Sequence, residues 1–145
     1  MRHLAIFKNA SRLREAGNAF ILAELAREGL TGIVPSHGDI LAQLLACESR
    51  NMGELARKAG RSKSTVTALV AKLEEQGYVE RRPDPDDSRG VRVRLTPKGR
   101  ALQPAFDRIS EGLSRLVTSR LTAEEARQLD ALLEKCLQGD TGGRG

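Results

Sequence analysis

Apolar residues in the N-terminal part of the chain recur every three or four positions, which is the spacing of one face of an α-helix. This pattern predicts a helix over residues 4–28, ended by Gly29. A second helix is expected to begin at Ser36, whose hydroxyl can cap it, with Asp39 in its first turn. The buried face of this second helix consists of Ile40, Leu41, Leu44 and Leu45.

Two shorter helices follow, each with a capping residue at its start. Asn51 with Glu54 three positions later predicts a helix that Gly60 ends. Ser62 opens the next helix, and Gly77 stops it. The inward stripe of that helix is Val66, Leu69, Val70 and Leu73. Two helices joined by a short turn containing glycine have the spacing of a helix-turn-helix.

After Gly77 the apolar period changes from that of a helix to that of a strand. Residues 78–82 and 91–95 predict two short strands, and the second alternates apolar residues with arginine. The intervening residues 83–90 are rich in Pro, Asp and Gly, so they predict the loop of a hairpin with Arg89 near its tip.

The C-terminal third of the chain returns to helical spacing. Thr96-Pro97 predicts a helix start, and Pro104 is expected to bend that helix because proline lacks the backbone donor. Thr122 opens a last helix that runs to about Leu137, and the Gly-rich residues 139–145 are expected to be a disordered tail. A heptad seam is formed by Leu102, Phe106, Ile109, Leu113 and Leu116.

The charge of the 145-residue chain is concentrated in its middle. The whole sequence has 24 Lys and Arg against 19 Asp and Glu, a net charge of +5. Residues 50–100 hold 13 of the basic and 7 of the acidic residues, so this segment alone carries +6. A basic segment within a nearly neutral remainder favours nucleic acid or another anionic partner.

Several classes of protein are not expected. The longest apolar run, residues 19–23, is much shorter than a membrane span, and the N-terminus lacks a signal-peptide pattern. Two cysteines and two histidines without paired spacing predict neither a disulfide framework nor a metal site, which suits a reduced, cytoplasmic protein. The sequence has no nucleophile–base constellation and no phosphate-binding loop, so neither an enzyme nor a cofactor is expected.

The outward face of the helix that Ser62 opens carries small and hydroxyl side chains between cations. Such a face can enter a DNA major groove, where hydroxyls contact phosphates or base edges. The hairpin adds Arg89, which can reach the adjacent minor groove, with an Asp of the same loop to orient it. Arg92 could contact DNA, or it could simply be a solvent-exposed side chain of an edge strand. The candidate DNA-binding residues are Arg61, Ser62, Lys63, Ser64, Thr65, Thr67, Lys72, Asp87, Arg89 and Arg92.

Five short motifs occur in order across residues 36–100. They are Asn51-Met52-Gly53-Glu54-Leu55-Ala56, Ser62-Lys63-Ser64-Thr65-Val66-Thr67, Leu73-Glu74-Glu75-Gln76-Gly77-Tyr78-Val79, Asp87-Ser88-Arg89 and Leu95-Thr96-Pro97-Lys98-Gly99. Together they resemble the MarR family of bacterial transcriptional regulators. Any one of these motifs alone is weak, whereas five in register are specific.

The resemblance implies a mainly α fold with a small β-hairpin wing, in which a winged helix-turn-helix domain joins a helical dimerisation region. It implies a homodimer that binds double-stranded DNA at a palindromic operator, usually as a repressor, and often a small-molecule effector. Ser62 through Thr67 would begin the recognition helix, and Arg89 would be the minor-groove arginine that Asp87 accompanies. The expected boundaries are 1–35 and 97–138 for dimerisation, 36–96 for DNA binding and 139–145 for the tail.

Alternatives remain for regulation and for the class of function. By analogy, an effector would bind between the helical region and the winged domain, near Ile33, Pro35, His37 and Phe106. An oxidant-sensing regulator would switch through Cys47 instead. A protein-interaction module with a winged helix would bind no DNA, and its affinity for DNA would show no salt dependence.

Overall fold

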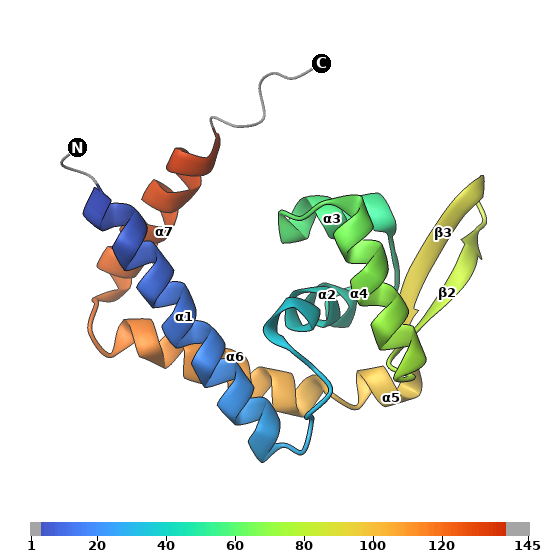
Figure 1. Cartoon of the computed structure of the whole chain (residues 1–145), viewed down its shortest axis with the longest axis horizontal. Helices are drawn as coiled ribbons and strands as arrows, with labels where there is room; N and C mark the ends of the chain where they lie inside the picture. Colours follow the sequence, from blue (N-terminus) through green and yellow to red (C-terminus); the bar gives the residue numbers. More distant parts are fainter. Residues whose placement is uncertain (1–3, 139–145) are drawn as a thin grey trace. The chain divides into compact units, whose positions relative to one another are not determined.

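The computed structural model describes residues 4–138 and is mainly helical (Figure 1). Its elements are α1 (Leu4–Arg27), α2 (Pro35–Leu45), β1 (Arg50–Asn51), α3 (Met52–Ala59), α4 (Lys63–Glu75), β2 (Val79–Asp84), β3 (Asp87–Leu95), α5 (Pro97–Arg100), α6 (Gln103–Thr118) and α7 (Ala123–Leu137). The chain forms two compact units, one up to Ile109 and one from Ser110 onward.

The core of the first unit is aliphatic. It lies where α2, α3 and α4 pack on one another and on the sheet. Each fully buried aliphatic side chain contributes roughly 1.5–3 kcal/mol relative to an exposed one, so this core stabilises the position of α4. Its largest fully buried side chains are Ile33, Ile40, Leu41, Leu44, Leu55, Val66, Val70, Leu73, Val79 and Val93.

The capping residues predicted for α3 and α4 are confirmed. The Asn51 side chain accepts a hydrogen bond from the Glu54 backbone N–H at 2.8 Å, and Ser62 does the same for Thr65 at 3.2 Å. Gly60 lies between the helices at a φ of +65°, a conformation that L-residues with a Cβ rarely adopt. Gly60 and Ser62 thus define the turn between α3 and α4, and Asn51 fixes the start of α3.

The predicted start of α2 is wrong in detail. The N-cap is Val34 and Pro35 occupies the first turn, so Ser36 does not cap the helix and Asp39 lies beyond the first turn. The Nδ1 atom of His37 accepts a hydrogen bond from the Val34 N–H at 3.3 Å, which satisfies the donor at this end. Proline suits the first helical turn because that turn lacks acceptors for its N–H groups.

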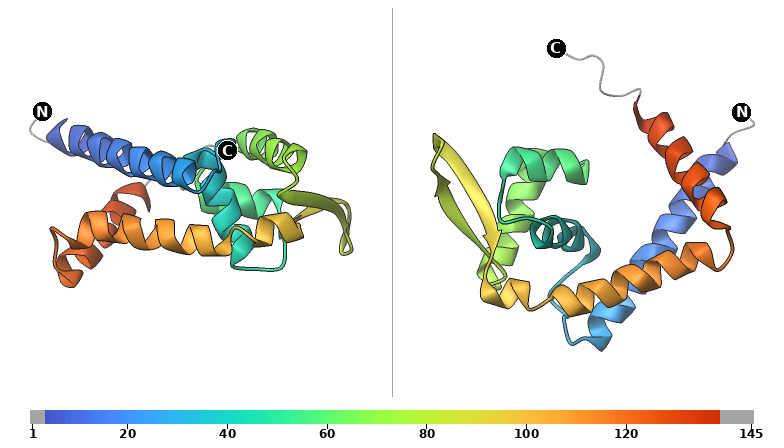
Figure 2. Two further views of the ribbon diagram at one scale, coloured as in Figure 1. Left: turned by 90° about the horizontal axis from the view of Figure 1, so that it is seen from below. Right: turned by 180° about the vertical axis from the view of Figure 1, so that it is seen from behind.

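The hairpin is longer than predicted. Residues 83–90 were expected to form a loop, but only Pro85 and Asp86 form the turn and the remainder extends β2 and β3. A further strand that the sequence pattern did not predict, β1, pairs antiparallel with β3 and gives the sheet order β1-β3-β2. Two residues are too few to show an alternating pattern. Figure 2 shows the hairpin as a narrow ribbon that extends past the helices of its unit.

The predicted bend at Pro104 is a complete break. The helix that Thr96 caps ends at Arg100, and α6 begins separately at Gln103. Proline at position 104 cannot donate to the carbonyl of Arg100 and would clash with it in a continuous helix. Proline is tolerated in the first turn of α6, where it stands.

The second unit contains the rest of α6 and α7. Thr122 and Glu125 form the predicted capping box, with hydrogen bonds of 3.1 Å and 2.9 Å between side chains and backbone. The helix ends at Leu137, as expected, and the predicted disordered tail lies outside the described residues.

Gly99 is a position where we expect even one methyl group to destabilise the fold. A Cβ at Gly99 would lie 2.1 Å from the backbone oxygen of Tyr78 and 2.9 Å from Leu95 Cδ2. Gly99→Ala should therefore cost about 1–3 kcal/mol in the free energy of unfolding. Gly38→Ala is the control, because its Cβ meets nothing within 4 Å in α2 and should be neutral or stabilising. Equal midpoints of urea unfolding for the two variants would contradict this account.

Candidate nucleic-acid interface

The helix α4 presents one face to the core and the opposite face to solvent. It contacts α3, α2 and β2, and Figure 1 shows it between α3 and the hairpin. Of the predicted inner stripe, Val66, Val70 and Leu73 are buried and Leu69 is half-buried. The predicted outer residues are exposed, and they are Arg61, Ser62, Lys63, Ser64, Thr65, Thr67 and Lys72.

The hydroxyl groups at the start of α4 form a local cluster. Ser62 Oγ donates to Thr65 Oγ1 at 2.8 Å and lies 3.2 Å from Ser64 Oγ. Thr67 Oγ1 donates to the Lys63 backbone oxygen at 2.8 Å. Because the Thr67 proton is used within the helix, this hydroxyl can offer a ligand only its acceptor lone pairs, which suits the exposed N4 or N6 amino groups of bases.

The cations of this face differ from Arg81, Arg82, Arg92 and Arg94 of the hairpin, which are all in ion pairs. In the part of the chain that the structure describes, no ion pair engages Arg61, Lys63, Lys72 or Arg89. Cations without protein partners remain able to neutralise an external anion.

The turn of the hairpin is held by its own aspartates. The Asp84 side chain accepts from the Asp86 N–H at 2.9 Å, and the Asp87 side chain accepts from the Arg89 N–H at 3.0 Å. Asp87 thus fixes the backbone at Arg89, while the Arg89 side chain is exposed on β3 just past the turn. Both carboxylates act on the local backbone, as Asx turns do.

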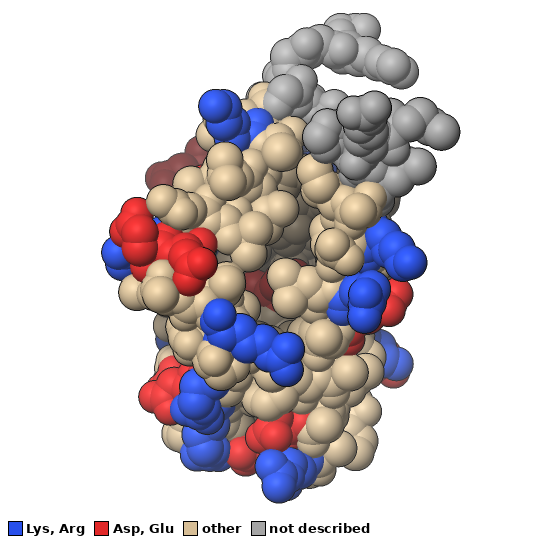
Figure 3. All heavy atoms as spheres, turned by 90° about the vertical axis from the view of Figure 1, so that its left-hand side faces the viewer, with Lys and Arg blue, Asp and Glu red and all other residues tan. Residues whose placement is uncertain are grey.

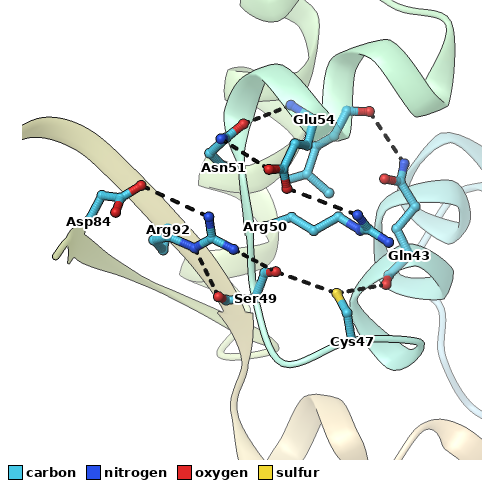
Figure 4. A network of polar contacts seen from close by, with 9 residues as sticks. Gln43, Cys47, Ser49, Arg50, Asn51, Glu54, Asp84 and Arg92 are labelled. Carbon is cyan, nitrogen blue, oxygen red and sulfur yellow. Dashed lines mark hydrogen bonds and ion pairs between the residues drawn. The ribbon is translucent and has the colours of Figure 1, made fainter. Parts of the chain in front are cut away.

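Arg92 and Arg94 lie on the same strand as Arg89 but have protein partners. Arg94 bonds to Glu80 on the facing strand. The Arg92 guanidinium is turned onto Ser49 and Asp84 (Figure 4). Of the three arginines on β3, only Arg89 extends into solvent without such a contact among the described residues.

An ion pair between Arg81 and Glu74 ties β2 to α4. The guanidinium donates to both carboxylate oxygens, at 2.9 Å and 3.2 Å, and this hydrogen bonding lowers the pKa of Glu74 below its usual value. The pair joins α4 to the part of β2 that lies opposite Val93. Sequence reasoning missed it, since neither residue stands out in the pattern before the register of β2 is known.

Cys47 is half-buried and its thiol hydrogen-bonds to backbone oxygens. The Sγ atom donates to the Gln43 oxygen at 3.2 Å and lies 3.6 Å from the Ser49 oxygen. A half-buried thiol with both contacts made inside the chain behaves as a small packing side chain. This geometry favours the interpretation of Cys47 as a packing residue over that of an oxidant switch.

The four residues suggested for an effector lie in the first unit at different depths. Ile33 and His37 are buried, and Pro35 and Phe106 are half-buried. His37 is already bonded to the Val34 N–H through Nδ1. A ligand could reach the two buried side chains only if the segment before α2 moved.

His37 predicts a pH dependence of stability. Burial, followed by the charge of Lys72, lowers the pKa of His37 below its usual value of 6.5. The folded state therefore prefers the neutral ring, so this contribution is complete above pH 6.5 and is lost as the pH falls through the lower, folded-state pKa. In His37→Gln, the unfolding free energy should vary less than in the wild-type chain as the pH falls below 6.5. Parallel wild-type and variant curves from urea titrations would contradict this assignment.

Other kinds of site find no support in the described residues 4–138. In that range, no three His, Cys, Asp or Glu side chains lie close enough together to hold a metal ion. Across the same residues, no helix has the length and apolar character needed to cross a bilayer.

A helix-turn-helix followed by a two-stranded hairpin, with an exposed recognition face on its second helix, defines the winged helix-turn-helix class of proteins. The model of the MarR family matches residues 28–90, which contain α2 through most of the hairpin. The chain belongs to the MarR family of winged helix-turn-helix transcriptional regulators.

Relatives of known sequence and structure agree with this assignment. The multiple antibiotic resistance protein MarR of Salmonella typhimurium is 40% identical over 73 residues, which are 50% of this chain and 51% of that protein. An HTH-type transcriptional regulator of Bacillus subtilis, YdgJ, is 31% identical over 108 residues, covering 74% and 66% of the two chains. The chain thus matches only about half the length of the MarR relative. The S. aureus MepR–DNA complex superposes with a TM-score of 0.78 at 26% identity, over 93% of this chain and 96% of that chain.

Proposed function

We propose that this chain is a sequence-specific, double-stranded-DNA-binding transcriptional repressor that acts as a homodimer on a palindromic operator. The observation that carries the proposal is the exposed face at the start of α4, which holds hydroxyls and cations that are in no ion pair among the described residues; the exposed Arg89 of the wing adds a further cation. The MepR relative was solved in complex with DNA, which supports the same use of this fold. Phosphate contacts would give salt-dependent affinity, and the α4 face would select the sequence.

Dimerisation is supported by apolar surface in both units. Residues exposed on α1 include Ile6, Phe7, Leu13 and Leu22, and those on α7 include Leu129, Leu132, Leu133 and Leu137. Figure 3 shows uncharged surface on the side that it presents, with acidic and basic side chains lying among it. Apolar patches of this kind mark interfaces in stable proteins. A two-fold dimer would set its recognition helices about 34–36 Å apart, one turn of DNA or a multiple of it.

A small-molecule effector would release the DNA by binding better to a dimer whose recognition helices have a different spacing. Our proposed location is Ile33 in the segment before α2, Pro35 and His37 in the first turn of α2, and Phe106 on α6. A ligand there would have to displace a packed segment, so binding should change the proteolysis of residues 28–34. His37→Gln should lower the affinity for that ligand without lowering the affinity for DNA.

The test is selection of duplexes by the purified full chain from a random library, followed by titration of the selected site against salt. We expect an enriched palindrome, two protomers bound per site, and a steep decrease in affinity with increasing salt. The same titration with a shuffled duplex of equal length is the control. Equal affinities for the two duplexes, or no salt dependence, would contradict sequence-specific DNA binding and favour the protein-interaction module.

A further inference from the structure

Arg92 lies at the point where the wing leaves the rest of the sheet. β1 pairs with β3 at Arg92 and Val93, opposite Asn51 and Arg50. From Val91 to the turn, β3 pairs only with β2 in the sheet that the structure describes. An isolated two-stranded ribbon is marginally stable in water, so the direction of this one depends on contacts close to Arg92.

The Arg92 guanidinium supplies such contacts in two directions. Its Nε and Nη2 atoms donate to Ser49 Oγ at 2.9 Å and to the Ser49 backbone oxygen at 3.0 Å (Figure 4). Its Nη1 atom lies 3.9 Å from Asp84 Oδ2, at the end of β2. The side chain is only 29% exposed. One planar group therefore joins the far part of the ribbon to the segment between α2 and β1.

The segment that receives Arg92 is itself fixed. Arg100 donates to the Cys47 backbone oxygen at 3.1 Å, and the Cys47 thiol bonds to Gln43. Two residues after Ser49, Asn51 is at once the strand partner of Arg92 and the N-cap of α3. The wing is thus anchored on the residues that begin the helix-turn-helix.

We propose that Arg92 is a positioning residue of the DNA interface and makes no contact with DNA. Its hydrogen bonds to Ser49, with the ion pair to Asp84, hold the wing in one direction before DNA arrives; we call this contact set the Arg92 clasp. The proposal rests on the proposed function, because it assigns how the wing that carries Arg89 is aimed. A flexible ribbon would have to be ordered on binding, which lowers affinity.

The decisive variants are Ser49→Ala, which removes no charge, and Arg92→Lys, which retains the charge but not the planar fork. Each should weaken binding to the selected operator by about threefold to tenfold. The double variant should be no weaker than the weaker single variant, because both changes open one clasp. Arg82→Lys is the matched control, since Arg82 faces Arg92 across the strands and only reaches Glu80 at 3.5 Å. It should bind like the wild-type chain.

A measurement without DNA gives an independent readout. Opening the clasp should increase the rate of amide hydrogen exchange at Val91 and Asp84 of the ribbon, relative to the wild-type chain. Exchange at Val70 in α4 and the melting temperature should not change, which separates loss of wing position from general destabilisation.

The outcomes separate the clasp from the proposed function. If Ser49→Ala and Arg92→Lys both bind the operator like the wild-type chain, Arg92 does not position the wing. Additive effects in the double variant would likewise overturn the clasp. If the wild-type chain binds no DNA, the proposed function fails, and unchanged hydrogen exchange in the ribbon of Ser49→Ala would still overturn the clasp by itself.

Discussion

Arg89→Ala should lower the affinity of the dimer for its operator by roughly 100-fold. The side chain is exposed on β3, its backbone is fixed by Asp87, and it has no ion pair among the described residues. A dimer carries two wings, so the substitution removes two cationic contacts with DNA. Each contact contributes about tenfold to the affinity, or about 1.4 kcal/mol. The slope of log affinity against log salt should become shallower by about 2, at about 0.9 for each lost phosphate contact. Fluorescence anisotropy at several salt concentrations measures both quantities.

A control must separate this contact from the loss of net charge. Arg27→Ala removes the same charge from an exposed position in α1, where Arg27 pairs only with Glu24 at 3.1 Å. It should leave both the affinity and the salt slope nearly unchanged. If the two variants weaken binding equally, the wing makes no special contact and the effect is one of overall charge.

Local chemistry made the starts of α3, α4 and α7 predictable. Asn51, Ser62 and Thr122 each cap the helix that follows because the donor and acceptor lie within three residues of each other. The exposed face of α4 followed from the helical period alone, once its apolar stripe was assigned. The helix-turn-helix and the residues of its outer face could therefore be obtained from sequence.

The wing was less predictable because its structure depends on pairing between distant residues. The register that places Arg82 opposite Arg92 extends both strands through the predicted loop. Ser49 and Arg92 are separated by 43 positions, and no local pattern joins them. The sequence pattern therefore made Arg92 a candidate DNA-binding residue, whereas in the structure its side chain hydrogen-bonds to Ser49. The strand that carries Arg92 is central in the sheet and not the edge strand that the sequence suggested, so its role became clear only from its partners in the fold.

Leu133→Glu should convert the proposed dimer into monomers and abolish tight operator binding. Residues at 129, 132, 133, 136 and 137 follow the spacing of one helical face, yet no residue of α7 is buried in the single chain. A 15-residue helix is marginal in water unless its apolar face packs on a partner. Because the interface is two-fold, it would contain two such carboxylates, one from each protomer. Their burial should cost about 3 kcal/mol or more in the free energy of dimerisation, which raises the dimer dissociation constant roughly 100-fold.

Ala131→Glu is the matched control for this prediction. It adds the same charge to the same helix, but position 131 lies on the side opposite to the apolar stripe and is exposed. Sedimentation velocity should show monomers for Leu133→Glu and dimers for Ala131→Glu, with both winged units melting like the wild-type unit. Since a monomer holds only one half-site, operator affinity should decrease in the first variant alone. Two dimeric variants would mean that the α7 stripe is covered by something other than a second copy of the chain.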